Sequence, residues 1–377
     1  MKKFIPVVCF LILLIWLSGC GRNKPGTGTG EVSVSPVPTD MVPTGPATPT
    51  AAPTVTGAVT PVAEEEPAIA DYYPFRENTE YIYTGEGNEY ASYNLYTDYI
   101  ADNRAQFRII TGGSEIVKVL ENTNGSLILH LSRGETYFRE NFIDKTDGND
   151  EILLKEPLVK GTEWTLSDNR RRYISNTNIE VDTPYGRLRT IEVITEKNNT
   201  TERNIDYYAK GIGLVKTIYA SDANAVTSEL SKIKEDTPFL QTVLFYFPNF
   251  DKNLIKTAEK EISFQTNDIT RLKLQEAFNE FSREEYEPLI SANTRINSLY
   301  LMNDEVVSVD FSKEFVTEMN SGSAFEEMIL QCITNTLGNY YGVGQVIITV
   351  EGKPYESGHF VMEKGETFKV NMDKVEQ

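Results

Sequence analysis

Residues 296–302 and 305–311 each alternate apolar and polar side chains, and the pair Asn303-Asp304 separates them. Alternation with a period of two is typical of a strand that buries one face. Asn and Asp tolerate the positive φ angles of a two-residue turn. The pattern therefore predicts a β-hairpin over residues 296–311.

A different period follows in residues 323–350. Ser323 and Glu326 have the spacing of a capping box, in which each side chain bonds to a backbone N–H of the first helical turn. Behind them, one apolar stripe at helical spacing comprises Phe325, Met328, Ile329, Cys332, Ile333 and Leu337. Gly338 predicts the end of the helix, and residues 345–350 predict a strand. The whole stretch contains no evident reactive group.

Residues 70–236 show almost no helical periodicity. Instead, short runs rich in Tyr, Ile, Val and Thr alternate with turn signals made of Gly, Asn and Asp. The predicted strands are 89–100, 104–111, 115–121, 127–132, 170–174, 187–195, 202–208 and 214–219. Regular spacing of short strands is typical of an antiparallel sheet. We therefore expect one antiparallel β-sheet domain here, curved or half-barrel in form.

A second domain is predicted over residues 237–377. It begins with the dense apolar strand 242–247, and 260–264 is a weaker strand candidate. Asn267 or Asp268 is placed to cap a following helix. Together with the hairpin, helix and strand described above, the order is β-(β)-α-β-β-α-β, an α/β sandwich. The fold class expected for the chain is α+β with two domains.

The N-terminus carries the strongest signal in the sequence. Two lysines precede an apolar run over residues 4–17, which is typical of a secretory signal peptide; a membrane-spanning helix needs ~20 apolar residues. The run closes with Leu-Ser-Gly-Cys at residues 17–20, which resembles a bacterial lipobox. This resemblance implies that residues 1–19 are a lipoprotein signal peptide and that Cys20 receives acyl chains such as palmitate. The alternative is an ordinary cleaved signal peptide with an incidental cysteine.

Residues 20–69 differ abruptly in composition from the rest. Between residues 25 and 63, Pro, Thr and Gly occupy 22 of 39 positions, and aromatic residues, Lys and Arg are absent. Such a segment buries too little apolar surface to offset the entropy lost on ordering. We expect a disordered tether over residues 20–69, which would hold the folded part away from the bilayer.

The chain contains 36 Lys and Arg against 55 Asp and Glu, a formal net charge of −19. Without residues 1–19 the balance is 34 against 55, or −21. This charge argues against nucleic acid as a partner, because nucleic-acid binding needs clustered basic residues. It also argues against attraction to anionic lipid head groups. We therefore expect contact with the membrane only through the acyl chains on Cys20.

The three cysteines predict neither a disulfide nor a reactive thiol in the folded part of the chain. Cys9 leaves with the signal peptide and Cys20 is the expected lipidation site, so Cys332 remains alone and no intramolecular disulfide is expected. We interpret Cys332 as a small buried hydrophobic residue.

No constellation of reactive residues stands out elsewhere. The two histidines, His130 and His359, fall in different predicted domains, and no HExxH motif occurs. Asp147 and its acidic neighbours around Gly148 lack the spacing of an EF-hand and are interpreted as a solvated turn. Ser231 begins a Ser-x-x-Lys motif but is placed in an interdomain connector, and the third element of penicillin-binding proteins is missing. We expect no catalytic, cofactor-binding or metal-binding residue, no cofactor and no enzymatic activity.

One alternative for the first domain is an aromatic groove for a glycan or a lipid. The tyrosines that would line it are among Tyr72, Tyr73, Tyr81, Tyr83, Tyr90, Tyr93 and Tyr96. Tyrosine is also a good strand former, so a structural role is the main interpretation. In the same domain, the stretches 72–75, 158–164, 183–186 and 206–215 resemble a β-rich domain of bacterial surface lipoproteins. That resemblance implies fold and location only.

The second domain resembles a GerMN domain, the module named for sporulation and germination lipoproteins. The resemblance rests on the stretches 244–249, 307–312, 334–337 and 343–353, and it covers about residues 240–360. The family is not known for an enzymatic activity, and its fold is similar to ring-building modules of secretion and sporulation complexes. The resemblance therefore implies interaction or assembly with envelope or sporulation proteins on the outer face of the membrane.

Overall fold

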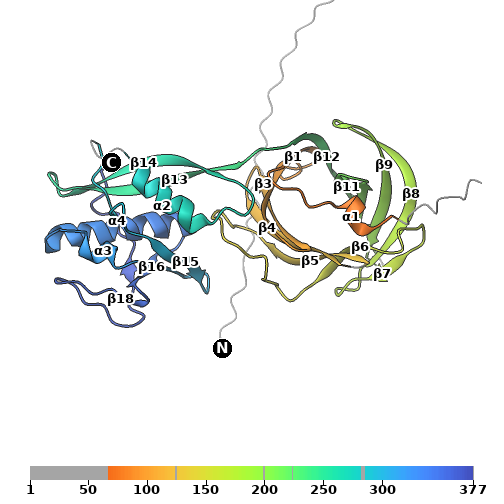
Figure 1. Cartoon of the computed structure of the whole chain (residues 1–377). Helices are drawn as coiled ribbons and strands as arrows, with labels where there is room; N and C mark the ends of the chain where they lie inside the picture. Colours follow the sequence, from red (N-terminus) through yellow and green to blue (C-terminus); the bar gives the residue numbers. More distant parts are fainter. Residues whose placement is uncertain (1–66, 124, 198–199, 223, 282–284, 377) are drawn as a thin grey trace, which may run out of the picture. The chain divides into compact units, whose positions relative to one another are not determined.

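The computed structural model describes residues 67–123, 125–197, 200–222, 224–281 and 285–376. The predicted signal peptide, Cys20 and nearly all of the predicted tether lie outside these ranges. The described chain is mostly β-structure with few helices, as Figure 1 shows, and the predicted α+β class is confirmed.

The first part of the chain forms one antiparallel sheet of 12 strands, ordered β6-β5-β4-β3-β2-β1-β12-β11-β10-β9-β8-β7. Its strands are β1 (Glu80–Glu86), β2 (Tyr93–Ala101), β3 (Arg104–Thr111), β4 (Glu115–Thr123), β5 (Ser126–Arg133), β6 (Glu151–Lys155), β7 (Glu163–Thr165), β8 (Arg171–Thr183), β9 (Gly186–Glu196), β10 (Arg203–Ala209), β11 (Gly213–Ala220) and β12 (Ala225–Lys234). Two meanders of successive strands are therefore joined through the pairing of β1 with β12.

The sheet curves until its two outer strands approach each other (Figure 1). Side chains bridge the remaining seam between them. Trp164 on β7 donates from Nε1 to the carbonyl oxygen of Ile152 on β6 at 3.0 Å. Arg172 on β8 donates to the same carbonyl at 2.6 Å. The sheet is therefore nearly closed, which agrees with the curved form expected from the sequence.

The concave side of this sheet is filled by the first described residues. The short helix α1 (Ile69–Tyr72) lies within the curve, and Ile69 is buried. Tyr73 follows and packs edge-on against Phe107, with ring centroids 6.0 Å apart. The segment that begins the described chain thus completes the core of the sheet.

The second part contains two smaller sheets and three helices. Its elements are β13 (Phe239–Asn249), β14 (Leu254–Phe264), α2 (Thr270–Glu280), β15 (Ile296–Met302), β16 (Val306–Phe311), α3 (Glu314–Thr317), α4 (Ser323–Tyr341), β17 (Gln345–Val350), β18 (Lys353–Pro354) and β19 (Phe368–Lys369). Strands β13 and β14 form an antiparallel ribbon, and the other sheet has the order β15-β16-β17-β18 with β19 also on β17. Strands β16 and β17 are parallel, so the connection through α4 crosses over between them.

One apolar core joins the second part to the first sheet. Val117 on β4 and Leu131 on β5 belong to the same buried cluster as Phe245 on β13 and Ile333 on α4. Residues 64–377 form one compact unit. The predicted second domain therefore packs directly on the sheet that precedes it.

The predicted hairpin is confirmed. Strands β15 and β16 are antiparallel, and Leu299 lies opposite Val309. Three residues, 303–305, connect the strands, so the turn is one residue longer than the predicted two-residue turn. Asn303 and Asp304 have φ angles of 49° and 61°. These angles are the left-handed values that the choice of Asn and Asp predicted.

Both predicted ends of the long helix are wrong. The N-cap of α4 is Gly322, which has no side chain to cap the helix, and Ser323 already lies inside the first turn. The helix continues past Gly338 to Tyr341 and ends at Gly342, whose φ of 71° is left-handed. Tertiary packing explains the glycine at 338, because a Cβ there would clash with Val370.

Two other local predictions are also wrong. Neither Asn267 nor Asp268 caps α2, whose N-cap is Ile269; Asn267 Oδ1 instead accepts the N–H of Ile100 at 2.9 Å. Strands β1, β6, β7 and β12 were not predicted, and Ser231 lies in β12, not in a connector.

Candidate functional site

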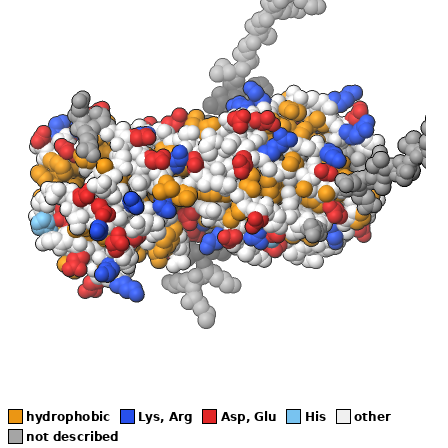
Figure 2. All heavy atoms as spheres, in the orientation of Figure 1, with side chains coloured by type: hydrophobic (Ala, Val, Ile, Leu, Met, Phe, Trp, Pro, Cys, Tyr) orange, Lys and Arg blue, Asp and Glu red, His pale blue; other side chains and the backbone are white. Residues whose placement is uncertain are grey.

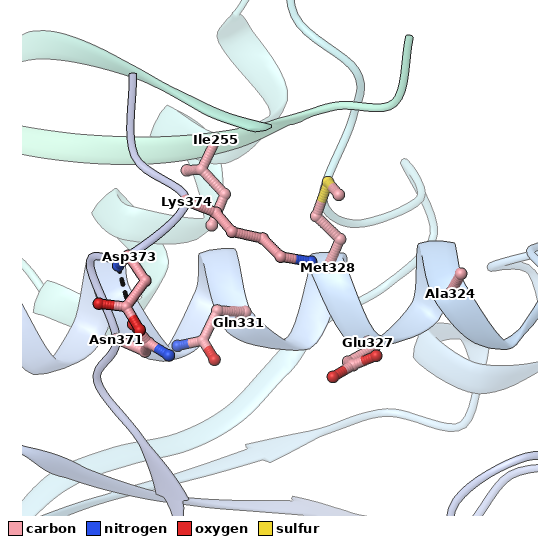
Figure 3. A pocket seen from close by; sticks show the side chains of 8 residues that line it. All are labelled: Ile255, Ala324, Glu327, Met328, Gln331, Asn371, Asp373 and Lys374. Atoms are coloured by element: carbon pink, nitrogen blue, oxygen red, sulfur yellow. Dashed lines mark hydrogen bonds between the residues drawn. The ribbon is translucent and has the colours of Figure 1, made fainter. Parts of the chain in front are cut away.

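The candidate site is a groove of about 170 Å³ along one face of α4. Figure 3 shows this face of the helix with the chain segment that follows β19 beside it. The lining residues are Ile255, Ala324, Glu327, Met328, Gln331, Asn371, Asp373 and Lys374. We call this site the α4 groove.

Hydrogen bonds fix the segment that forms the second wall of the groove. Asn335 on α4 donates from Nδ2 to the carbonyl oxygen of Asn371 at 2.7 Å, and the N–H of Asn371 donates back to Asn335 Oδ1 at 3.0 Å. Further along, the N–H of Ile255 on β14 donates to the carbonyl oxygen of Lys374 at 2.8 Å. The wall is therefore anchored both to the helix and to the β-ribbon.

Two exposed apolar residues are sequence neighbours of lining residues, Phe325 of Ala324 and Met372 of Asn371 and Asp373. Phe325 on α4 is 46% exposed and stacks on Phe250, with ring centroids 4.1 Å apart. Met372 is 42% exposed. Glu327 and Asp373 add acidic groups to the lining. An apolar surface with a few charged groups around a concave site is typical of a place that binds another molecule.

Figure 2 shows how the side chains are distributed over one face of the molecule. Hydrophobic, acidic and basic side chains are interspersed there, without an extended patch of one charge. The net negative charge of the chain is thus spread over this face, as expected for solubility.

A second cluster surrounds Glu326, next to a cavity of about 180 Å³ that Ser321 also lines. Tyr355 donates from its hydroxyl to Glu326 Oε1 at 2.7 Å, and His359 Nδ1 lies 2.6 Å from Glu326 Oε2. Burial alone would raise the pKa of this carboxyl, but hydrogen bonds from Ser357, His359 and Tyr355 outweigh it and lower the pKa below its usual value.

This cluster ties the start of α4 to the chain around Tyr355. Glu326 is the residue that the sequence assigned to a capping box, and the structure turns it toward the core instead. The pairing of His359 with Glu326 was not predicted from the sequence, because no local pattern links residues 33 positions apart. Among the described residues, His359 Nε2 makes no hydrogen bond to a serine or a cysteine.

The other residues singled out by the sequence lie apart from the groove. Cys332 is fully buried, and burial raises the pKa of its thiol. His130 contacts Glu121 at 2.7 Å and Asp150 at 2.8 Å. Asp147 accepts the N–H of Asn149 at 2.8 Å, which fits the predicted turn. In the described part of the chain, no three His, Cys, Asp or Glu side chains are grouped to hold a metal ion.

The seven tyrosines proposed for a groove are not brought together as one surface. Tyr73, Tyr81 and Tyr83 line a space of only about 10 Å³. Tyr83 stacks on Tyr93 at 4.4 Å, whereas Tyr90 is 52% exposed. The chain's own aromatic side chains therefore occupy the concave side of the sheet.

Cys20, the expected lipidation site, lies outside the described residues. Within the ranges that the structure covers, no helix combines the length and the apolarity needed to cross a bilayer.

Comparisons with known proteins single out the second part of the chain. The family model described as "Germane: Sporulation and spore germination" matches residues 244–356. This match confirms the resemblance to a GerMN domain. The matched residues include those of α4 that line the α4 groove, but not the segment from Asn371 to Lys374 that forms its second wall. No curated protein matches the chain.

Three solved structures show similarity to parts of the chain. The tandem GerMN domains of the sporulation protein GerM from Bacillus subtilis are 20% identical over 37% of this chain and 48% of that one, with a TM-score of 0.28. A putative lipoprotein from Clostridium perfringens is 19% identical over 35% and 87%, with a TM-score of 0.24. A putative lipoprotein from Parabacteroides distasonis is 13% identical over 43% and 98%, with a TM-score of 0.27.

Proposed function

We propose, on the premise that residues 244–356 form a Germane domain, that this protein is a non-enzymatic, lipid-anchored protein of the cell envelope. Its Germane domain binds another envelope protein through the α4 groove, and the role of the complex lies in sporulation or germination. The observation that carries the proposal is the position of the groove, whose α4 side lies within the Germane domain together with the exposed Phe325.

The chemistry of the groove supports a protein as the bound molecule. Phe325 is large, aromatic and exposed beside the groove, and aromatic residues are enriched where protein interfaces bury most of their energy. The cavity is small for a free metabolite, but its apolar border extends it into a surface that one side chain of a partner could enter. The lipobox-like sequence at residues 17–20 supports anchoring on the outer face of the membrane.

The proposal is tested by crosslinking in intact cells with the full chain. We expect one envelope protein, identified by mass spectrometry, to crosslink to the wild type and to be lost in a Phe325→Asp/Met372→Asp variant. Tyr219→Asp is the matched control, because Tyr219 is 40% exposed on the other sheet. Equal crosslinking of both variants, or loss in the control as well, would contradict the assignment of the groove.

A further inference from the structure

Strand β14 has a free edge. It pairs with β13 on one side, and on the other side only its beginning is covered. There, the carbonyl oxygen of Lys374 accepts the N–H of Ile255 at 2.8 Å, and the N–H of Glu376 donates to the carbonyl oxygen of Ile255 at 2.8 Å. The backbone groups of Ile255 therefore point away from β13.

Along β14, the backbone N–H and C=O groups of every second residue after Ile255 point in the same direction. The register of β14 against β13 has no bulge, so the N–H and C=O groups of Glu259, Glu261 and Ser263 also point away from β13. These three residues are exposed. Their backbone groups make no hydrogen bond to any described residue outside the ribbon. An unpaired row of this kind is a template for another strand.

The side chains along this edge are sorted by charge. Lys260 faces the helix side of the ribbon, where its Nζ contacts Glu280 on α2 at 2.5 Å and lies over the ring of Phe281 at 5.2 Å. Glu259 and Glu261 face the opposite side, where they lie across from Leu244 and Thr242 of β13. The ammonium group of Lys260 is thus paired within the protein, whereas the exposed side of the edge carries the carboxylates of Glu259 and Glu261.

This arrangement disfavours a second copy of the chain at the same edge. Antiparallel pairing of two β14 edges would place Glu259 or Glu261 directly opposite another glutamate, and like charges at opposed positions destabilise a sheet. A strand with basic residues at alternate positions would meet opposite charges instead. Its intervening side chains would lie beside Ala258 and Ile262, so apolar residues fit there.

We propose that the edge of β14 from Glu259 to Ser263 is a strand-addition site for an extended segment of another protein in which basic and apolar residues alternate. Main-chain hydrogen bonds would supply binding, and the two glutamates would select the basic residues. The inference goes beyond the proposed function, because residues 259–263 are not among those that line the α4 groove, and the edge does not require the groove to be occupied.

The test uses the full mature chain in detergent and a fluorescent peptide in which Lys and Val alternate. We expect this peptide to bind and to slow amide hydrogen exchange at Glu259, Glu261 and Ser263. A peptide alternating Glu and Val should bind roughly tenfold more weakly. A Glu259→Lys/Glu261→Lys variant should reverse this preference between the two peptides.

Two further variants make the result decisive. Glu261→Pro removes one outward N–H from an edge position that tolerates proline, and it should abolish slowed exchange with either peptide. Glu86→Lys/Glu89→Lys changes the charge equally at exposed positions, at the end of β1 and in the turn that follows it, and should leave binding unchanged. Absence of binding, protection elsewhere in the chain, undiminished binding to Glu261→Pro, or an equal loss in the control pair would each overturn the proposal.

Discussion

Arg139 donates a hydrogen bond from Nη2 to the backbone carbonyl oxygen of Asp98 at 2.7 Å, and both side chains are almost fully buried. The same nitrogen also reaches the carbonyl oxygen of Gln265 at 3.2 Å. Its guanidinium lies over the rings of Tyr99 and Phe264, at 4.2 and 4.9 Å from their centroids. One side chain from the loop between β5 and β6 thus links the first sheet to the end of β14.

Arg139 Nε also lies 3.5 Å from Asp98 Oδ1. Replacement of Arg139 with methionine should therefore destabilise the fold by about 3–5 kcal/mol, because it leaves the carboxylate of Asp98 buried with one partner fewer. Urea denaturation of both proteins measures the change. Arg171→Met is the control and should cost much less than Arg139→Met, since Arg171 forms ion pairs with Glu163 and Glu196 at the surface. Equal costs for the two variants would show that burial of Arg139 does not matter.

The link through Arg139 could not be predicted from the sequence. Arg139 lies in a loop without periodicity, and its contacts with Asp98 and Gln265 join residues 41 and 126 positions away. In the sequence, residues that make such distant contacts look like any other isolated polar residue. The hairpin at Asn303 was predictable because alternation and turn chemistry act between neighbours.

The α4 groove was only partly predictable for a similar reason. The apolar stripe predicted α4, and the motifs around it carried the resemblance to a GerMN domain. However, the second wall comes from residues near Asn371, whose bond to Asn335 spans 36 positions. Glu326 matched a capping box by spacing alone, whereas tertiary bonds to Tyr355 and His359 determine where its carboxyl lies.

Gly338→Ala should destabilise the protein, although alanine favours an isolated helix by roughly 0.5–1 kcal/mol over glycine. The new methyl group would clash with Val370 and crowd the carbonyl oxygen of Val343 at 2.9 Å. Overpacking of this kind typically costs about 1–3 kcal/mol.

Thermal denaturation of Gly338→Ala and of a Gly338→Ala/Val370→Ala double variant measures this effect. The double variant should recover part of the loss, because the shorter side chain at position 370 makes room for the methyl group. A Gly338→Ala protein that melts at or above the wild-type temperature would show that Val370 does not constrain the helix.

Cys20→Ser should abolish incorporation of a labelled fatty acid and leave an unprocessed precursor in the membrane fraction. The reason is chemical, since acylation of a lipobox proceeds through the thiol. Cys9→Ser is the matched control within the apolar run and should be labelled normally. Labelling of the Cys20→Ser protein would refute the expected anchor.

The stability of the fold should fall in acid in part because of Glu326. Its pKa is lowered in the folded state, since hydrogen bonds from Ser357, His359 and Tyr355 outweigh burial. The stabilisation is therefore complete above the unfolded pKa of about 4.5 and is lost as the pH falls through the folded pKa.

Urea denaturation of wild type and Glu326→Gln across this pH range measures the contribution. At neutral pH the variant should be less stable by about 1–3 kcal/mol, because Gln cannot satisfy both Tyr355 and His359 as a carboxylate does. The difference should shrink as the pH falls from about 4.5 through the lower folded pKa, where the folded wild-type carboxyl also loses its charge. Glu327→Gln, on the exposed side of the same turn, serves as the control and should show no such pH-dependent difference. A constant gap between wild type and Glu326→Gln at every pH would mean that packing, and not the charge of Glu326, holds the start of α4 in place.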